Sequence, residues 1–169
     1  MEVIMESNRI YYCRPKVEYA EFYTENINNP EIYRWLRSDP KIYTVQEEIE
    51  WIQSIQNDPV YTMIDKETGN IIGNCGFNSV TGDSCEIGIW ISIPYQNNHF
   101  GREAIERMIT YAIHDMKKRE ITLTVFANNE RAVHCYQNIG FHETYRVSGI
   151  HDGIGNPTED IHMIYKKKI

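Results

Sequence analysis

The sequence contains no paired cysteines and no excess of positive charge. Its four cysteines form no C-x-x-C pair, and no cysteine and histidine residues cluster at the spacing of a zinc site. We therefore expect reduced thiols, no bound metal and a cytoplasmic location. The net charge of -7 at pH 7 disfavours nucleic acid and anionic membranes as partners, and it favours cationic molecules.

Long apolar segments are also missing. The longest, IGIWISIPY at residues 87–95, is too short to cross a bilayer, and the first ten residues carry acids where a signal peptide would have a basic region. No internal repeat or low-complexity segment occurs. A length of 169 residues with 41 % apolar residues predicts a single folded domain over residues 1–169.

The hydrophobic pattern alternates between strands and helices along the chain. The early strands are joined by short turns and the middle ones by helices, which predicts an α/β (α+β) fold with a mixed sheet. Asn29 and Pro30 have the residue types of a helix N-cap and first helical position. We expect strands at residues 9–15, 59–65, 70–80, 84–93, 119–127, 141–150 and 159–168, and helices at residues 17–26, 28–36, 45–56, 101–116 and 129–140.

The stretch IPYQNNHFGREAI, residues 93–105, leads from a β-prone run into a helix. The first amides of a helix have no intrahelical partner and lie at the positive end of the helix dipole, so they bind anions. Gly101 at the helix start allows a phosphate to approach the backbone. Neither nucleotide-binding loop with a firm signature, G-x-x-x-x-G-K-[ST] or G-x-G-x-x-G, is present. The spacing alone suggests an anion site without identifying the ligand, and a nucleotide-binding α/β domain is disfavoured.

Three segments, in order, resemble the GNAT superfamily of acyl-CoA N-acyltransferases. QNNHFG at residues 96–101 resembles its motif A loop, Q/R-x-x-G-x-G/A, with His99 in the position of the middle glycine. VFANNERA at residues 125–132 resembles V-x-x-x-N-x-R-A, and YQNIGF at residues 136–141 resembles Y-x-x-x-G-F. Further segments are similar to the RimJ/RimL-like branch of the family, namely residues 10–15, 29–31, 51–52 and 160–163.

The resemblance implies a GNAT fold, in which a mixed central sheet is flanked by helices on both faces and two splayed central strands form a slot for acetyl-CoA. The amides from Gln96 to Arg102 would hold the pyrophosphate, and the pantetheine arm would lie along the strand at Trp90–Ile93. Asn129 would contact this arm, although it also suits a helix N-cap. The implied cofactor-binding residues are Trp90, Ile91, Ser92, Ile93, Gln96, Asn97, Asn98, His99, Phe100, Gly101, Arg102, Asn129 and Tyr136.

Tyr136 is the first candidate for a catalytic residue. When an amine attacks the thioester, a thiolate leaves, and a nearby phenol can protonate it. The alternative is an ordinary half-buried helix tyrosine. A backbone amide near Ile91 is a candidate donor to the oxyanion that forms during transfer.

Glu86 is the candidate general base, since the attacking amine must lose a proton. It alternates with Gly88 and Trp90 on one face of the predicted strand, where a carboxylate is costly to bury unless it has a partner. The alternative is a solvent-exposed carboxylate at a strand end. Glu31 is the second candidate, and Glu31 and Tyr33 are expected to bind the acceptor in this branch of the family.

Three functions stay open, of which two differ in the acceptor. A small cationic amine, such as a polyamine or an antibiotic-like amine, suits the negative charge of the chain. The RimJ/RimL-like branch implies a protein N-terminus, for example that of a ribosomal protein. A different class is a non-catalytic acyl-CoA-binding regulatory domain, against which the presence of Tyr136 and a candidate base argues. The family resemblance also leaves a homodimer open.

His99 replaces a glycine that usually serves a left-handed backbone or a close phosphate. Histidine is among the non-glycine residues that best tolerate positive φ. We therefore predict that His99 keeps the loop shape with its ring turned outward, and we hypothesise that the protonated ring donates to a phosphate oxygen.

Overall fold

Eight strands of one mixed sheet run through residues 1–166, the part of the chain that this computed structural model describes. Their order in the sheet is β1-β2-β3-β4-β5-β6-β8-β7. Neighbouring strands pair antiparallel, except that β5 and β6 pair parallel. The strands are β1 (Val3–Glu6), β2 (Ile10–Cys13), β3 (Val60–Asp65), β4 (Ile71–Thr81), β5 (Ser84–Ile91), β6 (Glu120–Phe126), β7 (His142–His151) and β8 (Pro157–Lys166).

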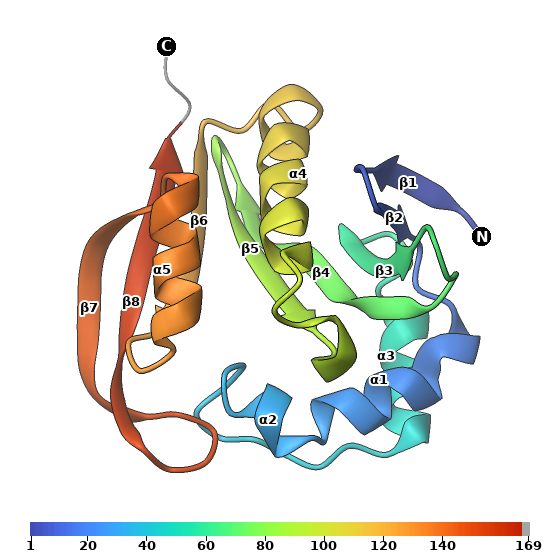
Figure 1. Cartoon of the computed structure of the whole chain (residues 1–169), viewed down its shortest axis with the longest axis horizontal. Coiled ribbons are helices and arrows are strands. Elements are labelled where there is room, and N and C mark those ends of the chain that lie inside the picture. The colour runs from blue at the N-terminus through green and yellow to red at the C-terminus, as the bar shows by residue number, and fades with distance from the viewer. Residues whose placement is uncertain (167–169) are drawn as a thin grey trace.

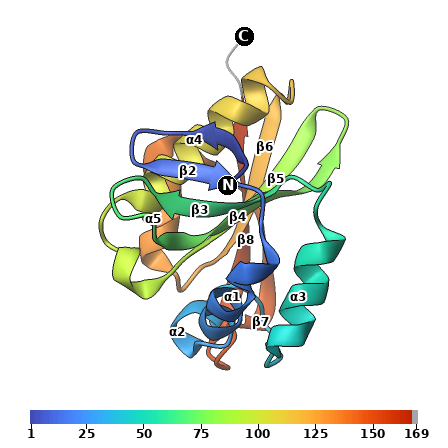
Figure 2. The ribbon, with the colours of Figure 1, turned by 90° about the vertical axis from the view of Figure 1, so that its right-hand side faces the viewer.

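Helices lie on both faces of this sheet, as predicted (Figures 1 and 2). Helices α4 and α5 cover one face, and α3 covers part of the other, with α1 packed beside it. The helices are α1 (Ala20–Ile27), α2 (Pro30–Tyr33), α3 (Val45–Ser54), α4 (Phe100–His114) and α5 (Glu130–Ile139), with single 3-10 turns η1 (Val17–Tyr19) and η2 (Ile93–Tyr95).

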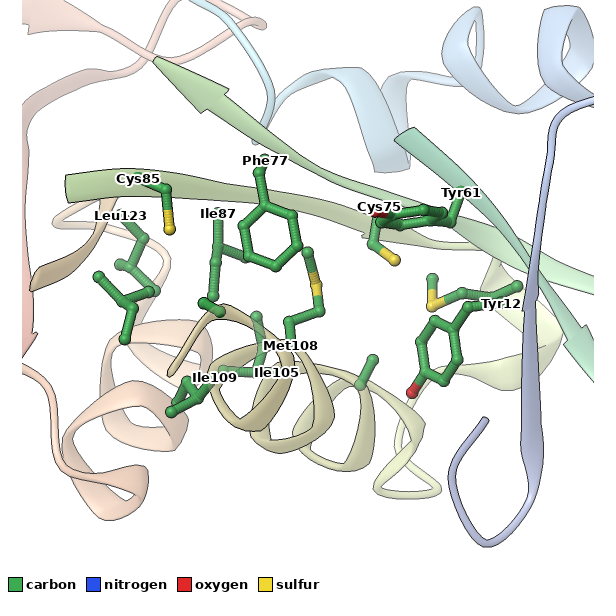
Figure 3. Packing of buried hydrophobic residues seen from close by; sticks show 14 of the residues in the cluster. Tyr12, Tyr61, Cys75, Phe77, Cys85, Ile87, Ile105, Met108, Ile109 and Leu123 are labelled. Atoms are coloured by element: carbon green, nitrogen blue, oxygen red, sulfur yellow. The ribbon is translucent and has the colours of Figure 1, made fainter. Parts of the chain in front are cut away.

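The main core forms between α4 and the middle of the sheet. Apolar residues recur every three or four positions in α4, so Ile105, Met108 and Ile109 share one buried face. Figure 3 shows these side chains opposite Cys85 and Ile87 of β5. Because side chains alternate along a strand, the residues between them on β5 face the side of α1 and α3. Truncating Met108, which is fully buried, to alanine would cost about 2–5 kcal/mol of folding stability.

Strands β5 and β6 part after a short paired stretch. Their register pairs are Ser84 with Glu120, Cys85 with Ile121, and Glu86 with Thr122. Beyond this point β5 continues beside β4 as far as Ile91, and β6 continues beside β8 as far as Phe126. The two central strands therefore diverge toward their C-terminal ends (Figure 1), which confirms the predicted splay.

Several predicted boundaries were wrong. An additional strand, β1, precedes the first predicted strand. It is only four residues long and buries one side chain, Met5. The helix predicted at residues 28–36 is the four-residue α2, because the amides of Trp35 and Leu36 bond three residues back, to the carbonyls of Ile32 and Tyr33, instead of four. Asn29 does cap α2: its side chain accepts from Glu31 N at 3.0 Å, and Pro30 follows. Strand β5 ends at Ile91, two residues early, and residues 167 and 168 of the last predicted strand lie outside the described residues.

Candidate functional site

The chain turns sharply where β5 ends. Ser92 is buried, and both its backbone amide and its hydroxyl donate to the carbonyl of Ile72, at 2.9 and 2.8 Å. The Gln96 side chain then donates to the carbonyl of Ile91 at 2.9 Å. The side chains of Ser92 and Gln96 thus shape the loop, and only their backbones remain as candidate cofactor contacts.

His99 lies in the left-handed region, with φ 63° and ψ 13°, which confirms the prediction for its backbone. Asn97 is also left-handed, with φ 65°. His99 is the N-cap of α4, and its side chain makes no capping hydrogen bond, so it leaves the first amides of the helix uncapped. This start of a 15-residue helix therefore has the properties of an anion site.

Neither the backbone conformation nor the packing of the protein requires a glycine at position 101. A β-carbon at this position would meet only Ile91 Cγ1, at the ordinary contact distance of 3.9 Å, and the backbone has no positive φ. Its open side therefore faces the end of β5. Space that the fold leaves free beside uncapped amides fits the pyrophosphate of a CoA-type molecule.

The neighbouring side chains are already engaged. The Phe100 ring is nearly buried beneath the Arg9 guanidinium, which lies 3.9 Å from the ring centre. Arg102 pairs with Glu106 one turn along the helix at 2.9 Å, and the Asn98 amide bonds back to the carbonyl of Gln96 at 3.3 Å. Backbone amides, rather than these side chains, are the groups free to bind a phosphate.

Tyr136 lies on α5, whose ten residues include none that is fully buried. Its apolar face, Ala132, Val133, Tyr136 and Ile139, packs against the core but stays partly accessible. The Tyr136 ring meets Phe141 edge to face, with 6.1 Å between ring centres. Burial, with a smaller contribution from the neighbouring Cys135, raises the pKa of Tyr136 to about 12. Its phenol therefore keeps its proton throughout the neutral pH range.

Asn129 occupies the N-cap position of α5, and its carbonyl accepts from Val133 N at 3.1 Å. Its side chain makes no capping hydrogen bond. Of the two interpretations from the sequence, the position of an N-cap is correct, but the side chain is left available for a ligand.

Glu86 lies where β5 and β6 are still paired, on the face of the sheet opposite Ile87. It is half-buried and makes no ion pair within residues 1–166. Trp90, four residues further along β5, stacks on Phe22 and meets Tyr23 edge to face, with ring centres 6.2 and 5.7 Å apart. At about 3.3 Å per strand residue, Glu86 is about 13 Å from Trp90. The structure thus places the candidate base at the closed end of the slot, away from the end where the cofactor candidates gather.

Glu31 and Tyr33 lie on α2, which runs below the opening between β5 and β6 (Figure 1). Glu31 is exposed and Tyr33 is half-buried. A separate hollow of about 1090 Å³ lies between α1, the turn that joins β3 to β4, and residues 92–95. Phe22 and Glu25 line it, but neither Tyr136 nor Glu86 does.

Sequence reasoning missed a buried polar cluster centred on Asp152, in the loop between β7 and β8. This side chain is 0 % exposed. Burial alone would raise the pKa of Asp152, but hydrogen bonds from the Asn156 backbone, the Asn128 side chain and the Ile154 backbone outweigh it and hold the pKa at about 2. The segment HDGIGNPT has the composition of a turn, and nothing local distinguishes an aspartate that is exposed in a turn from one that is buried.

The described residues contain no helix that is long and apolar enough to cross a membrane. The four cysteines are free, and Cys13, Cys75 and Cys85 are buried.

Comparison with known proteins identifies the family. A family model described as an acetyltransferase (GNAT) domain matches residues 9–142. The chain belongs to the GNAT acetyltransferase family. One curated relative is an uncharacterised N-acetyltransferase p20 from Bacillus licheniformis, which is 22 % identical over 143 residues and is matched over 80 % of each chain.

Solved GNAT structures have the same fold. A GNAT acetyltransferase from Bacillus anthracis superposes with a TM-score of 0.84 over 98 % of each chain, at 15 % identity. Spermidine N-acetyltransferase from Vibrio cholerae, in complex with CoA and spermine, also gives 0.84, over 95 % of this chain and 96 % of that one, at 20 % identity. The family match and these relatives make the chain an N-acetyltransferase.

Proposed function

We propose that this chain transfers an acetyl group from acetyl-CoA directly to a primary amine, with Tyr136 and Glu86 as its catalytic residues. The observation that carries the proposal is the open, uncapped start of α4 beside the end of a strand that has parted from its neighbour. Together, these backbone amides and this strand edge provide the two kinds of group that bind a CoA-type molecule.

The residues of the chain supply two kinds of binding. The amides from Gln96 to Arg102 would hold the pyrophosphate at the positive end of α4. The edge of β5 from Ile87 to Ile91, which β6 no longer covers, would pair with the amides of the pantetheine arm, and Asn129 would contact that arm from α5. Acetyl-CoA, when bound, supplies the activated acetyl thioester.

The two catalytic candidates would donate and accept protons during the transfer. Tyr136 holds a proton on Oη at neutral pH, because burial raises its pKa to about 12, and it is therefore suited to donate that proton to a leaving thiolate. Glu86 is suited to accept the proton of the ammonium group. Because it lies at the closed end of the slot, we infer that it acts through water rather than by direct contact.

A small cationic amine is the acceptor that the charge of the chain favours. The net charge is -7, which attracts cationic molecules to the chain as a whole. A relative with the same fold acts on spermidine, which supports a polyamine as one such amine.

A protein N-terminus, as in the RimJ/RimL-like branch, is the second candidate acceptor. The segments at residues 10–15, 29–31, 51–52 and 160–163 favour it. Of these, residues 29–31 form the capped start of α2. It lies below the mouth of the slot, by which we mean the open end between the C-terminal ends of β5 and β6. Self-association and a cytoplasmic location stay predictions.

An acceptor screen tests the proposal. Purified protein is mixed with acetyl-CoA and, separately, with spermidine, an aminoglycoside and short peptides with free N-termini, and thiol release is followed. We expect at least one amine to accelerate thiol release, and the same reaction to slow in Tyr136→Phe. If acetyl-CoA binds by calorimetry while no amine accelerates thiol release, the chain is a non-catalytic acyl-CoA-binding domain and the proposal is wrong.

A further inference from the structure

The Asp152 carboxylate gathers three segments of the chain at one point. Its Oδ1 accepts from the backbone amides of Ile154 and Asn156, both at 3.0 Å. Its Oδ2 accepts from the side chains of Asn128 at 2.9 Å and Asn156 at 3.3 Å, and Arg34 Nη2 lies 3.4 Å from it. One fully buried side chain thus joins its own loop to the end of β6 and to the segment after α2.

The joined segments lie on opposite sides of the slot. Asn128 follows β6 and directly precedes Asn129 and α5, which carries Tyr136. Arg34 directly follows α2, which carries the acceptor candidates. In Figure 1, α2 and the loop between β7 and β8 close the lower side of the opening between β5 and β6. The ion pair between Arg34 and Asp152 therefore links the two sides across the mouth.

A second contact makes the link tight. Gly153 N donates to the carbonyl of Arg34 at 2.9 Å. A β-carbon on Gly153 would lie 2.8 Å from both Arg34 Cα and the carbonyl oxygen of Tyr33, so only glycine allows the backbones to approach this closely. The loop between β7 and β8 thus meets the segment after α2 without spare room.

The cluster contains both paired and unpaired polar atoms. Arg34 Nε and Asn128 Oδ1 are buried without a hydrogen-bond partner among the described residues, and leaving polar atoms in this state destabilises a fold. Both atoms belong to side chains that Asp152 holds in place.

We propose that Asp152, through Arg34 and Asn128, is a positioning residue for acetyl transfer. It holds α2 at a fixed separation from the start of α5 and so sets the width of the mouth through which the acceptor amine reaches the acetyl group. This inference rests on the proposed function, and it assigns no contact between Asp152 and either substrate.

Arg34→Met tests the link across the mouth. It removes the ion pair but leaves the bonds of Asp152 to Asn128, Ile154 and Asn156. Arg146→Met is the matched control, because it makes the same change on β7 and breaks exposed ion pairs with Glu143 and Glu159. Spermidine and a tetrapeptide with a free N-terminus serve as acceptors, and CoA binding is measured by calorimetry below the unfolding temperature of each variant.

We expect Arg34→Met to raise the KM for the amine at least five-fold, with the dissociation constant of CoA changed less than two-fold. Arg34→Lys should restore part of the effect, and Arg146→Met should match the wild type. If Arg34→Met and Arg146→Met have the same KM for both amines, the positioning role is wrong even though the wild type is active. A wild type that turns over no amine overturns the proposed function, and the positioning role with it.

Discussion

Glu86 of β5 and Thr122 of β6 form the last register pair before these two parallel strands part. The carboxylate therefore stands at the closed end of the slot, on the face that α4 does not cover. Its neighbour Gly88 has no side chain, so the strand surface between Glu86 and Trp90 is low, and only the Asn78 side chain lies near it, at 3.0 Å from the position of a β-carbon. The Asn78 side chain therefore covers Gly88, between the carboxylate and Trp90.

Replacing Glu86 with glutamine should slow transfer most at neutral pH. We expect kcat/KM at pH 7 to fall about 100-fold, since general bases contribute roughly 10²–10⁴-fold. The difference from the wild type should narrow toward pH 10, because a larger fraction of the amine is then already neutral. Rate profiles from pH 6 to 10 measure this, with the exposed Glu50→Gln as control. Parallel profiles for Glu86→Gln and the wild type would remove Glu86 from the mechanism.

Tyr136→Phe should lower kcat at least ten-fold and leave acetyl-CoA affinity nearly unchanged. The phenol of Tyr136 is the group removed, while the contact of the ring with Phe141 is kept. Because burial raises the pKa of Tyr136 to about 12, the phenol stays protonated up to about pH 11, so we expect no loss of wild-type kcat from its ionisation between pH 6 and 10.

Tyr165→Phe is the control for Tyr136, since Tyr165 packs against the same Phe141 with ring centres 5.8 Å apart. Initial-rate assays with acetyl-CoA and the amine both at saturating concentration give kcat for both variants. Equal kcat in Tyr136→Phe and Tyr165→Phe would mean that Tyr136 is only a packing residue.

Gly101→Ala should separate stability from cofactor binding. The fold leaves room for a methyl group at this position, and alanine favours a helix over glycine by up to about 1 kcal/mol. We therefore expect an unchanged or higher free energy of unfolding together with weaker CoA binding, because the methyl group occupies the space beside the first amides of α4. Urea unfolding and calorimetry measure the two effects. Unchanged CoA affinity would show that the phosphate does not approach Gly101.

The elements that depend on local residue patterns could be predicted from the sequence. The helical spacing of Ile105, Met108 and Ile109 predicts α4, and the tolerance of histidine for positive φ predicts the backbone of His99 correctly. The sequence did not reveal that α2 ends after one turn, nor that Gly153, more than 100 residues away, donates to the carbonyl of Arg34. The buried state of Asp152 also depends on distant partners. Of the candidate site, the loop and the slot could be predicted, whereas the distance of Glu86 from the mouth required the register of β5 and β6.

Asp152 should make the fold sensitive to acid. Its folded pKa of about 2 lies below the ordinary 3.8, so its stabilising effect is fully present above about pH 4 and is lost as the pH falls toward 2. The shift corresponds to on the order of 2 kcal/mol. We expect Asp152→Asn to be less stable at pH 7 and to lose less stability than the wild type between pH 5 and 2. Urea unfolding across this range measures both, and equal slopes for the two proteins would contradict the assignment.

His99 can be tested through its backbone and its ring separately. The left-handed backbone is free of strain for glycine but costs roughly 1 kcal/mol for alanine, so His99→Gly should be at least as stable as the wild type and His99→Ala less stable than His99→Gly by about that amount. A histidine ring gains positive charge as the pH falls from 8 to 6. If the charged ring donates to a phosphate oxygen, wild-type CoA affinity rises over this range while both variants stay flat. Calorimetry at pH 6, 7 and 8 decides between the roles, and a flat wild type would leave His99 with its backbone role alone.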